Sequence, residues 1–111
     1  SPGADPHPHL IALLRISQRD FRRVFGSTAI AWRGKATLQR NAALALGNIG
    51  DPQSVDALAA RLQSDAPPVV RGACAWALGQ IGNRQARTRL LAASAVETSP
   101  EVLEEIALAL H

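Results

Sequence analysis

Cysteine, charge and long apolar runs are all scarce in this sequence. Cys74 is the only cysteine among 111 residues, so the chain forms neither an internal disulfide nor a cysteine-ligated cluster. The apolar runs, such as HLIALL and ACAWALG, are far shorter than the roughly 20 residues that a membrane-spanning helix needs. No lysine-led signal peptide opens the sequence. These absences predict a soluble, cytoplasmic protein that does not associate with a membrane.

What the chain does contain is enough apolar surface for one folded domain. Hydrophobic residues make up 47% of the sequence and charged residues 19%, a balance that predicts a buried core rather than disorder. The net charge of +3 is distributed unevenly. Residues 1–40 carry seven basic side chains against two acidic ones, whereas residues 41–111 carry five basic and seven acidic. The positive field therefore belongs to the first third of the chain.

An internal repeat with an offset of 32 residues determines the predicted fold. The stretch AALALGNIGDPQSVDAL, from Ala42, aligns with CAWALGQIGNRQARTRL, from Cys74, and the two share the pattern ALGxIG. The same offset carries Pro68 onto Pro100 near the end of the chain. We therefore expect a repeat that begins three times and whose last copy is cut short at His111.

Each repeat is predicted to contain two helices. An aspartate followed by proline starts a helix over 52–62, and a second helix follows over 68–82 after a short turn. The face of the second helix opposite its main apolar stripe carries Gly72, Ala75 and Gly79, which are small enough to let another helix approach closely. A helix covered on both faces is typical of the inner row of a solenoid. The predicted fold class is thus all-α, a right-handed α-solenoid with a period of about 32 residues.

The segment before the repeats is predicted to contribute further helices to a domain over 10–111, with residues 1–9 as a linker. Helices are expected over 10–16, over 18–25 with Ser17 as the cap, and over 35–48, with a connecting link over 27–33. Asp5, His7 and His9 have the spacing of metal ligands, but flanking prolines hold them extended and no fourth ligand is near. We therefore favour a flexible linker over a metal site there.

The motifs that surround a basic cluster resemble a known family. The stretches DFRRVFG, WRGKATLQRNAALALGN and VRGACAWALGQIG, in this order, resemble the C-terminal region of bacterial epoxyqueuosine reductase over residues 10–83. The resemblance implies a fold of HEAT-like (PBS-lyase-type) repeats. It also implies a parent enzyme that reduces epoxyqueuosine to queuosine at the tRNA wobble position, with cobalamin and two [4Fe-4S] clusters as cofactors. The cysteine runs for those clusters are absent here, so we expect a non-catalytic fragment without cofactors of its own.

In that family the helical-repeat region helps hold the tRNA anticodon stem-loop against the catalytic domain, which implies these two partners for this chain. Cations along a phosphate path suit that role. The candidate nucleic-acid-binding residues are Arg22, Arg23, Trp32, Arg33, Lys35 and Arg40. For Trp32 we favour packing between the first helices over stacking on RNA. Arg40 has two equally good interpretations, an RNA contact and a solvated surface charge.

Other conspicuous residues are predicted to be structural. Arg71 is expected to bond loop carbonyls or one of two aspartates, Asp51 or Asp65. Cys74 lies on an apolar stripe and is expected to be buried and inert, and Trp76 is expected to pack against an adjacent helix. The glutamates at 101, 104 and 105 fall early in a helix, where carboxylates favour the helix dipole. The remaining alternative function is a general protein-binding scaffold, and we expect a monomer in either case.

Overall fold

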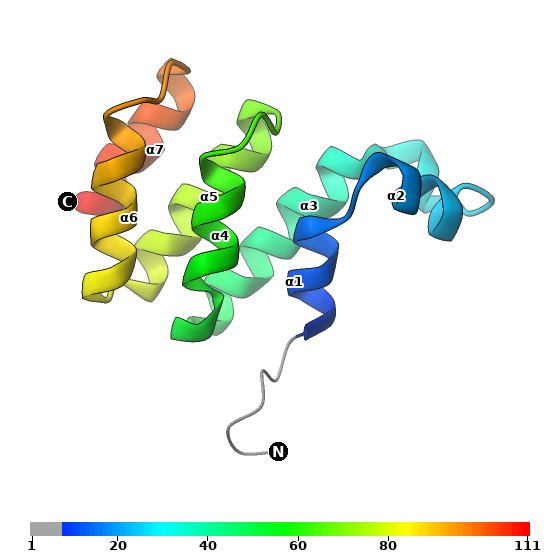
Figure 1. Cartoon of the computed structure of the whole chain (residues 1–111), viewed down its shortest axis with the longest axis horizontal. Coiled ribbons are helices and arrows are strands. Elements are labelled where there is room, and N and C mark those ends of the chain that lie inside the picture. Colours follow the sequence, from blue (N-terminus) through cyan, green and yellow to red (C-terminus); the bar gives the residue numbers. More distant parts are fainter. Residues whose placement is uncertain (1–7) are drawn as a thin grey trace.

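The computed structural model describes residues 8–111 as a row of helices joined by short turns, without a strand in that range (Figure 1). The elements are α1 (Pro8–Arg15), α2 (Gln18–Phe25), α3 (Ile30–Ile49), a 3₁₀ turn η1 (Pro52–Ser54), α4 (Val55–Leu62), α5 (Pro68–Ile81), α6 (Arg84–Ser94) and α7 (Pro100–Leu110). The predicted all-α class is confirmed. The predicted linker, residues 1–9, lies almost entirely outside the described residues, together with Asp5 and His7 of the histidine motif.

The helices form two rows. In Figure 1, α1, α4 and α6 stand in the nearer row, and α3, α5 and α7 cross behind them. The most extensive contacts join α3 to α5 and α5 to α7, and α5 also packs against α4 and α6. The central helix α5 is therefore covered on both faces, as the sequence predicted. Helix α6 lies 32 residues after the segment formed by η1 and α4, which confirms the repeat.

The boundaries of the repeat helices follow from their caps. Gly50 and Gly82 adopt left-handed backbone angles, with φ of 73° and 66°, and end α3 and α5. The Asp51 carboxylate accepts a hydrogen bond from the backbone N–H of Gln53 at 2.9 Å. The Asp51 side chain binds the N–H of a residue only two positions further along the chain. The helical segment therefore begins with the 3₁₀ turn η1, and α4 begins at Val55 rather than at residue 52.

The first helix of the repeat series departs from the prediction. Helix α3 begins at Ile30, inside the segment expected to be a link, and contains one non-helical residue, Gly34, with φ 84° and ψ 163°. Only glycine adopts this conformation readily, so Gly34 divides α3 into a short first part and a regular second part. The expected helix over 35–48 corresponds to the second part.

Small residues set the spacing of the inner row. A Cβ atom at Gly79 would lie 2.7 Å from Cβ of Ala109 in α7. At the equivalent position of the previous repeat, a Cβ at Gly47 would lie 2.6 Å from the Trp76 ring. Both glycines are therefore needed for close helix contact, and Trp76 packs against α3 as expected. The core beneath them is aliphatic, with Leu46, Leu58, Leu62, Val70, Leu78 and Leu90 fully or almost fully buried.

Candidate nucleic-acid interface

The predicted basic residues begin on α2, at the end of the molecule where α2 and the start of α3 lie together (Figure 1). The Ser17 hydroxyl accepts a hydrogen bond from the backbone N–H of Asp20 at 3.0 Å and starts α2. Phe21 is buried, and its ring lies 5.4 Å from that of Phe25. This apolar face docks α2 on the domain, so that its arginines lie on the solvent side.

The two arginines predicted on α2 are exposed, but they differ in their surroundings. Arg22 has no ion-pair partner within residues 8–111. The Arg23 guanidinium lies 3.0 Å from the Asp20 carboxylate, and the Arg23 side chain remains 72% exposed. The hydrogen bond that the Arg23 guanidinium donates, together with the nearby Ser17 hydroxyl, holds the pKa of the Asp20 carboxyl below its usual range. Because exposed pairs of this kind contribute little stability, Arg23 remains accessible to another anion.

Trp32 is 92% exposed, which contradicts the prediction that it packs between the first helices. The physical reason is the break at Gly34. Trp32 belongs to the short first part of α3, which is out of phase with the regular helix that faces the core. Val24 and Ile30, in the neighbouring segments, are also exposed, at 52% and 38%. An indole that contacts so little of its own domain is free to contact another molecule.

Arg33 and Lys35 lie on the two sides of Gly34. Arg33 is exposed and Lys35 half-buried, and neither has an ion-pair partner in the described part of the chain. Together with Arg22, Arg23 and Trp32, they form what we call the basic edge. The structure thus places five of the six predicted residues on α2 and the first turns of α3.

Arg40 does not belong to the basic edge. Five residues of regular helix separate it from Lys35, which turns the two side chains about 140° apart around the helix axis. Its guanidinium donates a hydrogen bond to the Asn41 side chain at 3.3 Å and borders a groove whose opposite wall carries Glu101, Glu104 and Glu105. The sequence cluster WRGKATLQRN is therefore split in space between two surfaces.

Gln39 joins α3 to the end of α1, a role that the sequence analysis missed. Its side chain is buried, at 1% exposure. The amide nitrogen lies 2.8 Å from the carbonyl oxygen of Leu14 and 3.3 Å from that of Ile16, so it donates to carbonyls at the end of α1. These carbonyls have no partner within their own helix. A signal for this role exists, because the 32-residue offset places Gln39 on Arg71, which was recognised as structural.

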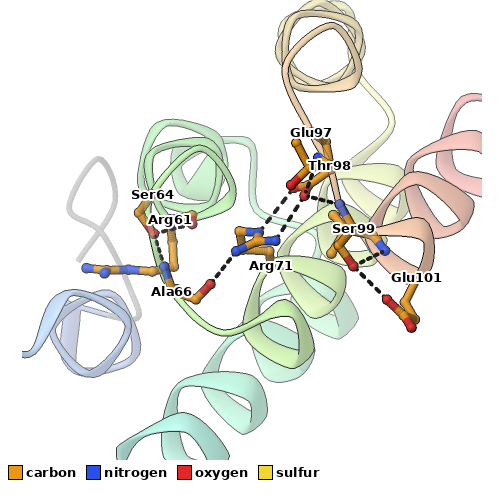
Figure 2. Close-up of polar contacts among 9 residues, drawn as sticks. Arg61, Ser64, Ala66, Arg71, Glu97, Thr98, Ser99 and Glu101 are labelled. Carbon is orange, nitrogen blue, oxygen red and sulfur yellow. Dashed lines mark hydrogen bonds and ion pairs between the residues drawn. The ribbon is translucent and has the colours of Figure 1, made fainter.

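Arg71 bonds a loop carbonyl as predicted, but its acidic partner is Glu97 rather than Asp51 or Asp65. Figure 2 shows its guanidinium between two turns. Nη1 donates to the Ala66 carbonyl at 2.6 Å, and Nε and Nη2 donate to the two Glu97 oxygens at 3.1 and 2.9 Å. The sequence alone favours the aspartates at 51 and 65, because residue 97 comes close to residue 71 only through the packing of separate helices.

The same network holds Glu97 ionised. Burial raises the pKa of its carboxyl, but the backbone N–H groups of Ser99 and Thr98 and the Arg71 guanidinium outweigh this effect and lower the pKa overall. Arg71 and Glu97 side chains are only 15% and 7% exposed. This pair ties the turn after α4 to the turn after α6 and has no free charge to offer a ligand.

The remaining candidates show no catalytic arrangement. Cys74 is fully buried, and burial raises the pKa of its thiol to about 12, in agreement with the predicted inert role. Glu101 lies in the first turn of α7, where a hydrogen bond from the Ser99 hydroxyl lowers the pKa of its carboxyl. Among the described residues no three metal-ligating side chains gather, and no helix there is long and apolar enough to cross a bilayer.

Comparison with known proteins agrees with this architecture. A family model of HEAT repeats matches residues 29–111. The chain belongs to the HEAT-repeat family. Among its HEAT-repeat relatives, the epoxyqueuosine reductase of Listeria monocytogenes is 42% identical over 99 residues, which are 89% of this chain and 26% of that protein. The epoxyqueuosine reductase of Bacillus cereus is 39% identical over 110 residues, 95% of this chain and 29% of that protein.

Solved structures give the same picture. An epoxyqueuosine reductase from Bacillus subtilis matches with a TM-score of 0.85 and 39% identity over 91% of this chain and 27% of that one. An epoxyqueuosine reductase crystallised with an epoxyqueuosine-modified tRNA-Tyr stem-loop matches with the same values. The resemblance predicted from the motifs is confirmed. This HEAT-repeat chain spans about a quarter of the length of these relatives.

Proposed function

We propose that this chain is the part of an epoxyqueuosine reductase that holds the tRNA anticodon stem-loop, and that the basic edge is its RNA-contacting surface. The observation that carries the proposal is the exposure of Trp32 on the same edge as Arg22 and Arg33, which have no ion-pair partner within residues 8–111. Two further findings support it. Relatives at about 40% identity are epoxyqueuosine reductases, and an epoxyqueuosine reductase with 39% identity was crystallised with a modified stem-loop.

Each residue of the basic edge has a specific role in this proposal. Arg22 and Arg33 bind phosphates directly, and Arg23 exchanges Asp20 for a phosphate oxygen at little cost. Lys35, the first residue after the helix break at Gly34, adds a further positive charge. Trp32 stacks on an unpaired base or a ribose of the loop. Because these contacts are mostly with phosphates, affinity depends on salt and weakly on sequence.

Arg40 takes a smaller part in RNA binding. It is exposed on the regular part of α3, turned away from Lys35 and facing glutamates across the groove. Phosphates that approach Arg40 therefore also approach three carboxylates, which oppose them electrostatically. We assign Arg40 to the limit of the RNA path, where the surface changes from basic to acidic.

The cofactors that the family resemblance implies do not fit this chain. A [4Fe-4S] cluster needs several accessible thiolates, whereas Cys74 is single, buried and protonated at neutral pH. We propose that cobalamin and both clusters are held by the rest of the parent enzyme, and that reduction takes place there. This chain contributes binding and orientation of the RNA.

Titration with a GUN-type anticodon stem-loop at two salt concentrations tests the proposal. We expect an Arg33→Ala/Lys35→Ala variant to bind more weakly and to lower the salt slope by about two, one for each lost phosphate contact. The matched control is Arg84→Ala/Arg87→Ala, which removes the same charge from α6. Equal losses in both variants, or binding by the unmodified chain that does not change with salt, would overturn the proposal.

A further inference from the structure

The helix break at Gly34 lies where the later repeats have a turn. The 32-residue offset places Gly34 in the turn before α5 and again in the turn before α7. Those two helices begin at Pro68 and Pro100, and a proline at the first helical position keeps the residue before it out of the helix. The equivalent residue of the first repeat is Ala36. In this repeat, Gly34 therefore takes the place of proline as the residue that interrupts the helix.

Packing does not explain the glycine at this position. A Cβ atom added at Gly34 would meet no other part of the described chain within 4 Å. Only the backbone requires glycine there, because φ of 84° with ψ of 163° is a conformation that other residues avoid. The break also adds nothing to the core, since Ile30, Trp32 and Arg33 are exposed and Ala31 is half-buried. A backbone conformation reserved for glycine that serves neither packing nor the core indicates a functional role.

Without the break, α3 would carry its first residues on other faces. Positions 32, 39 and 46 are seven residues apart, so they share one face of an uninterrupted helix. Gln39 and Leu46 on that face are buried, at 1% and 0% exposure. An uninterrupted α3 would therefore turn Trp32 to the side that faces the core. Arg33 would come into line with Arg40, seven residues further along, which borders the acidic groove.

Arg33 also differs in charge from its equivalents in the later repeats. The offset places it on Asp65 and Glu97. The Glu97 carboxylate binds Arg71 and joins two turns (Figure 2). Arg33, by contrast, is exposed and has no ion-pair partner within residues 8–111. A position that joins turns in a later repeat thus carries an exposed cation in the first, which suits contact with an external anion.

We propose that Gly34 is the positioning residue of the basic edge. Its backbone holds Ile30–Arg33 out of line with the rest of α3, so that the Trp32 indole and the Arg33 guanidinium are both directed toward the RNA. Gly34 acts through these two side chains. The inference rests on the RNA-binding role proposed above, and it adds that a single backbone conformation makes that role possible.

Replacement of Gly34 by each of the two mirror-image alanines tests this role. In a Trp76→Phe background Trp32 is the only tryptophan, and a labelled anticodon stem-loop reports affinity. L-Alanine disfavours positive φ and extends the helix, so the Gly34→Ala variant should emit at shorter wavelength and bind on the order of tenfold more weakly. D-Alanine accepts positive φ, so its variant should keep the emission and affinity of the parent chain. Ligation of synthetic 1–73 to 74–111 at Cys74 supplies this protein.

Two controls separate positioning from a loss of structure. Gly72→Ala makes the same substitution in α5, where an added Cβ meets only Cγ of Glu105 at 3.7 Å, and should leave emission and affinity unchanged. In a Trp32→Ala/Arg33→Ala chain, Gly34→Ala should cause no further loss of affinity, because the groups that Gly34 positions are already gone. Thermal melts establish that each variant is folded. If Gly34→Ala does not fold, the D-alanine variant alone decides.

Three results would overturn the proposal. The first is a folded Gly34→Ala variant in which either the Trp32 emission or the affinity stays that of the parent chain. The second is weak binding by a folded D-alanine variant. The third is a further loss of affinity on Gly34→Ala in the Trp32→Ala/Arg33→Ala chain. All three presuppose a parent chain that binds the stem-loop, whereas a parent chain that does not bind it overturns the RNA-binding role and this inference together.

Discussion

Arg71 and Arg89 of the repeat region and Arg22 and Arg33 of the basic edge have opposite surroundings. In the repeats, Arg71 is enclosed between two turns by Ala66 and Glu97, and Arg89 pairs with Asp56 at 3.0 Å. On the basic edge, Arg22 and Arg33 are exposed without an ion-pair partner in the described chain. Arg71 therefore joins two turns and Arg89 joins α6 to α4, whereas Arg22 and Arg33 remain accessible.

The largest effect in this comparison is expected from Arg71→Met. The substitution leaves the buried Glu97 carboxylate without its guanidinium and the Ala66 carbonyl without a donor. Loss of one partner from a buried pair typically costs about 3 kcal/mol of folding free energy. Chemical denaturation followed by circular dichroism measures it. An unfolding free energy within the error of the parent chain would show that the network contributes no stability.

Glu97 also makes stability depend on pH in a defined direction. Because its pKa is lowered in the folded state, the contribution of its carboxylate is complete above the ordinary pKa of a glutamate. It is lost as the pH falls through the folded pKa. We expect Glu97→Gln to be less stable than the parent chain at neutral pH and to lose less stability on acidification. Parallel acid titrations of the two proteins would contradict this assignment.

A smaller loss is expected from Gly79→Ala, which places a methyl group 2.7 Å from Cβ of Ala109. Overpacking of this kind exceeds the gain in helix propensity, and we expect a net loss of about 2 kcal/mol. The matched control is Gly72→Ala in the same helix, which meets only ordinary contacts and should gain about 0.5–1 kcal/mol. Thermal melts of the pair measure the contrast, and a stable Gly79→Ala variant would refute close packing of α5 on α7.

The smallest effect on stability is expected on the basic edge. Arg33→Ala/Lys35→Ala removes two cations that have no ion-pair partner among residues 8–111, so the free energy of unfolding should change by less than about 0.5 kcal/mol. The same denaturation experiment measures it. A loss as large as that of Arg71→Met would mean that these residues serve the fold rather than a ligand.

The sequence predicted the repeat region well because its signals are local. Helix caps at Asp51 and Ser99, glycine ends at Gly50 and Gly82 and a 32-residue period each act over a few residues or one repeat. Partners distant in the chain were harder to foresee. The Arg71–Glu97 pair and the Gln39 contact with α1 depend on how separate helices are arranged in space.

The surface was predicted less well than the fold, and a single residue explains most of the difference. Gly34, with φ 84°, interrupts the helix that carries Trp32, Arg33, Lys35 and Arg40. The sequence analysis placed Trp32 and Arg33 in a link and began the helix at Lys35, and it favoured packing for Trp32 because a tryptophan is usually buried. The break instead turns Trp32 into solvent, and the regular helix after the break turns Arg40 away from Lys35 toward an acidic groove.

The fluorescence of Trp32 tests most directly whether the basic edge faces RNA. A Trp76→Phe variant leaves Trp32 as the only tryptophan, 92% exposed in the free protein. On addition of the anticodon stem-loop at low salt, its emission should be quenched, and added salt should restore it. An emission that stays constant while the stem-loop binds would contradict the central claim, because the RNA would then contact another surface.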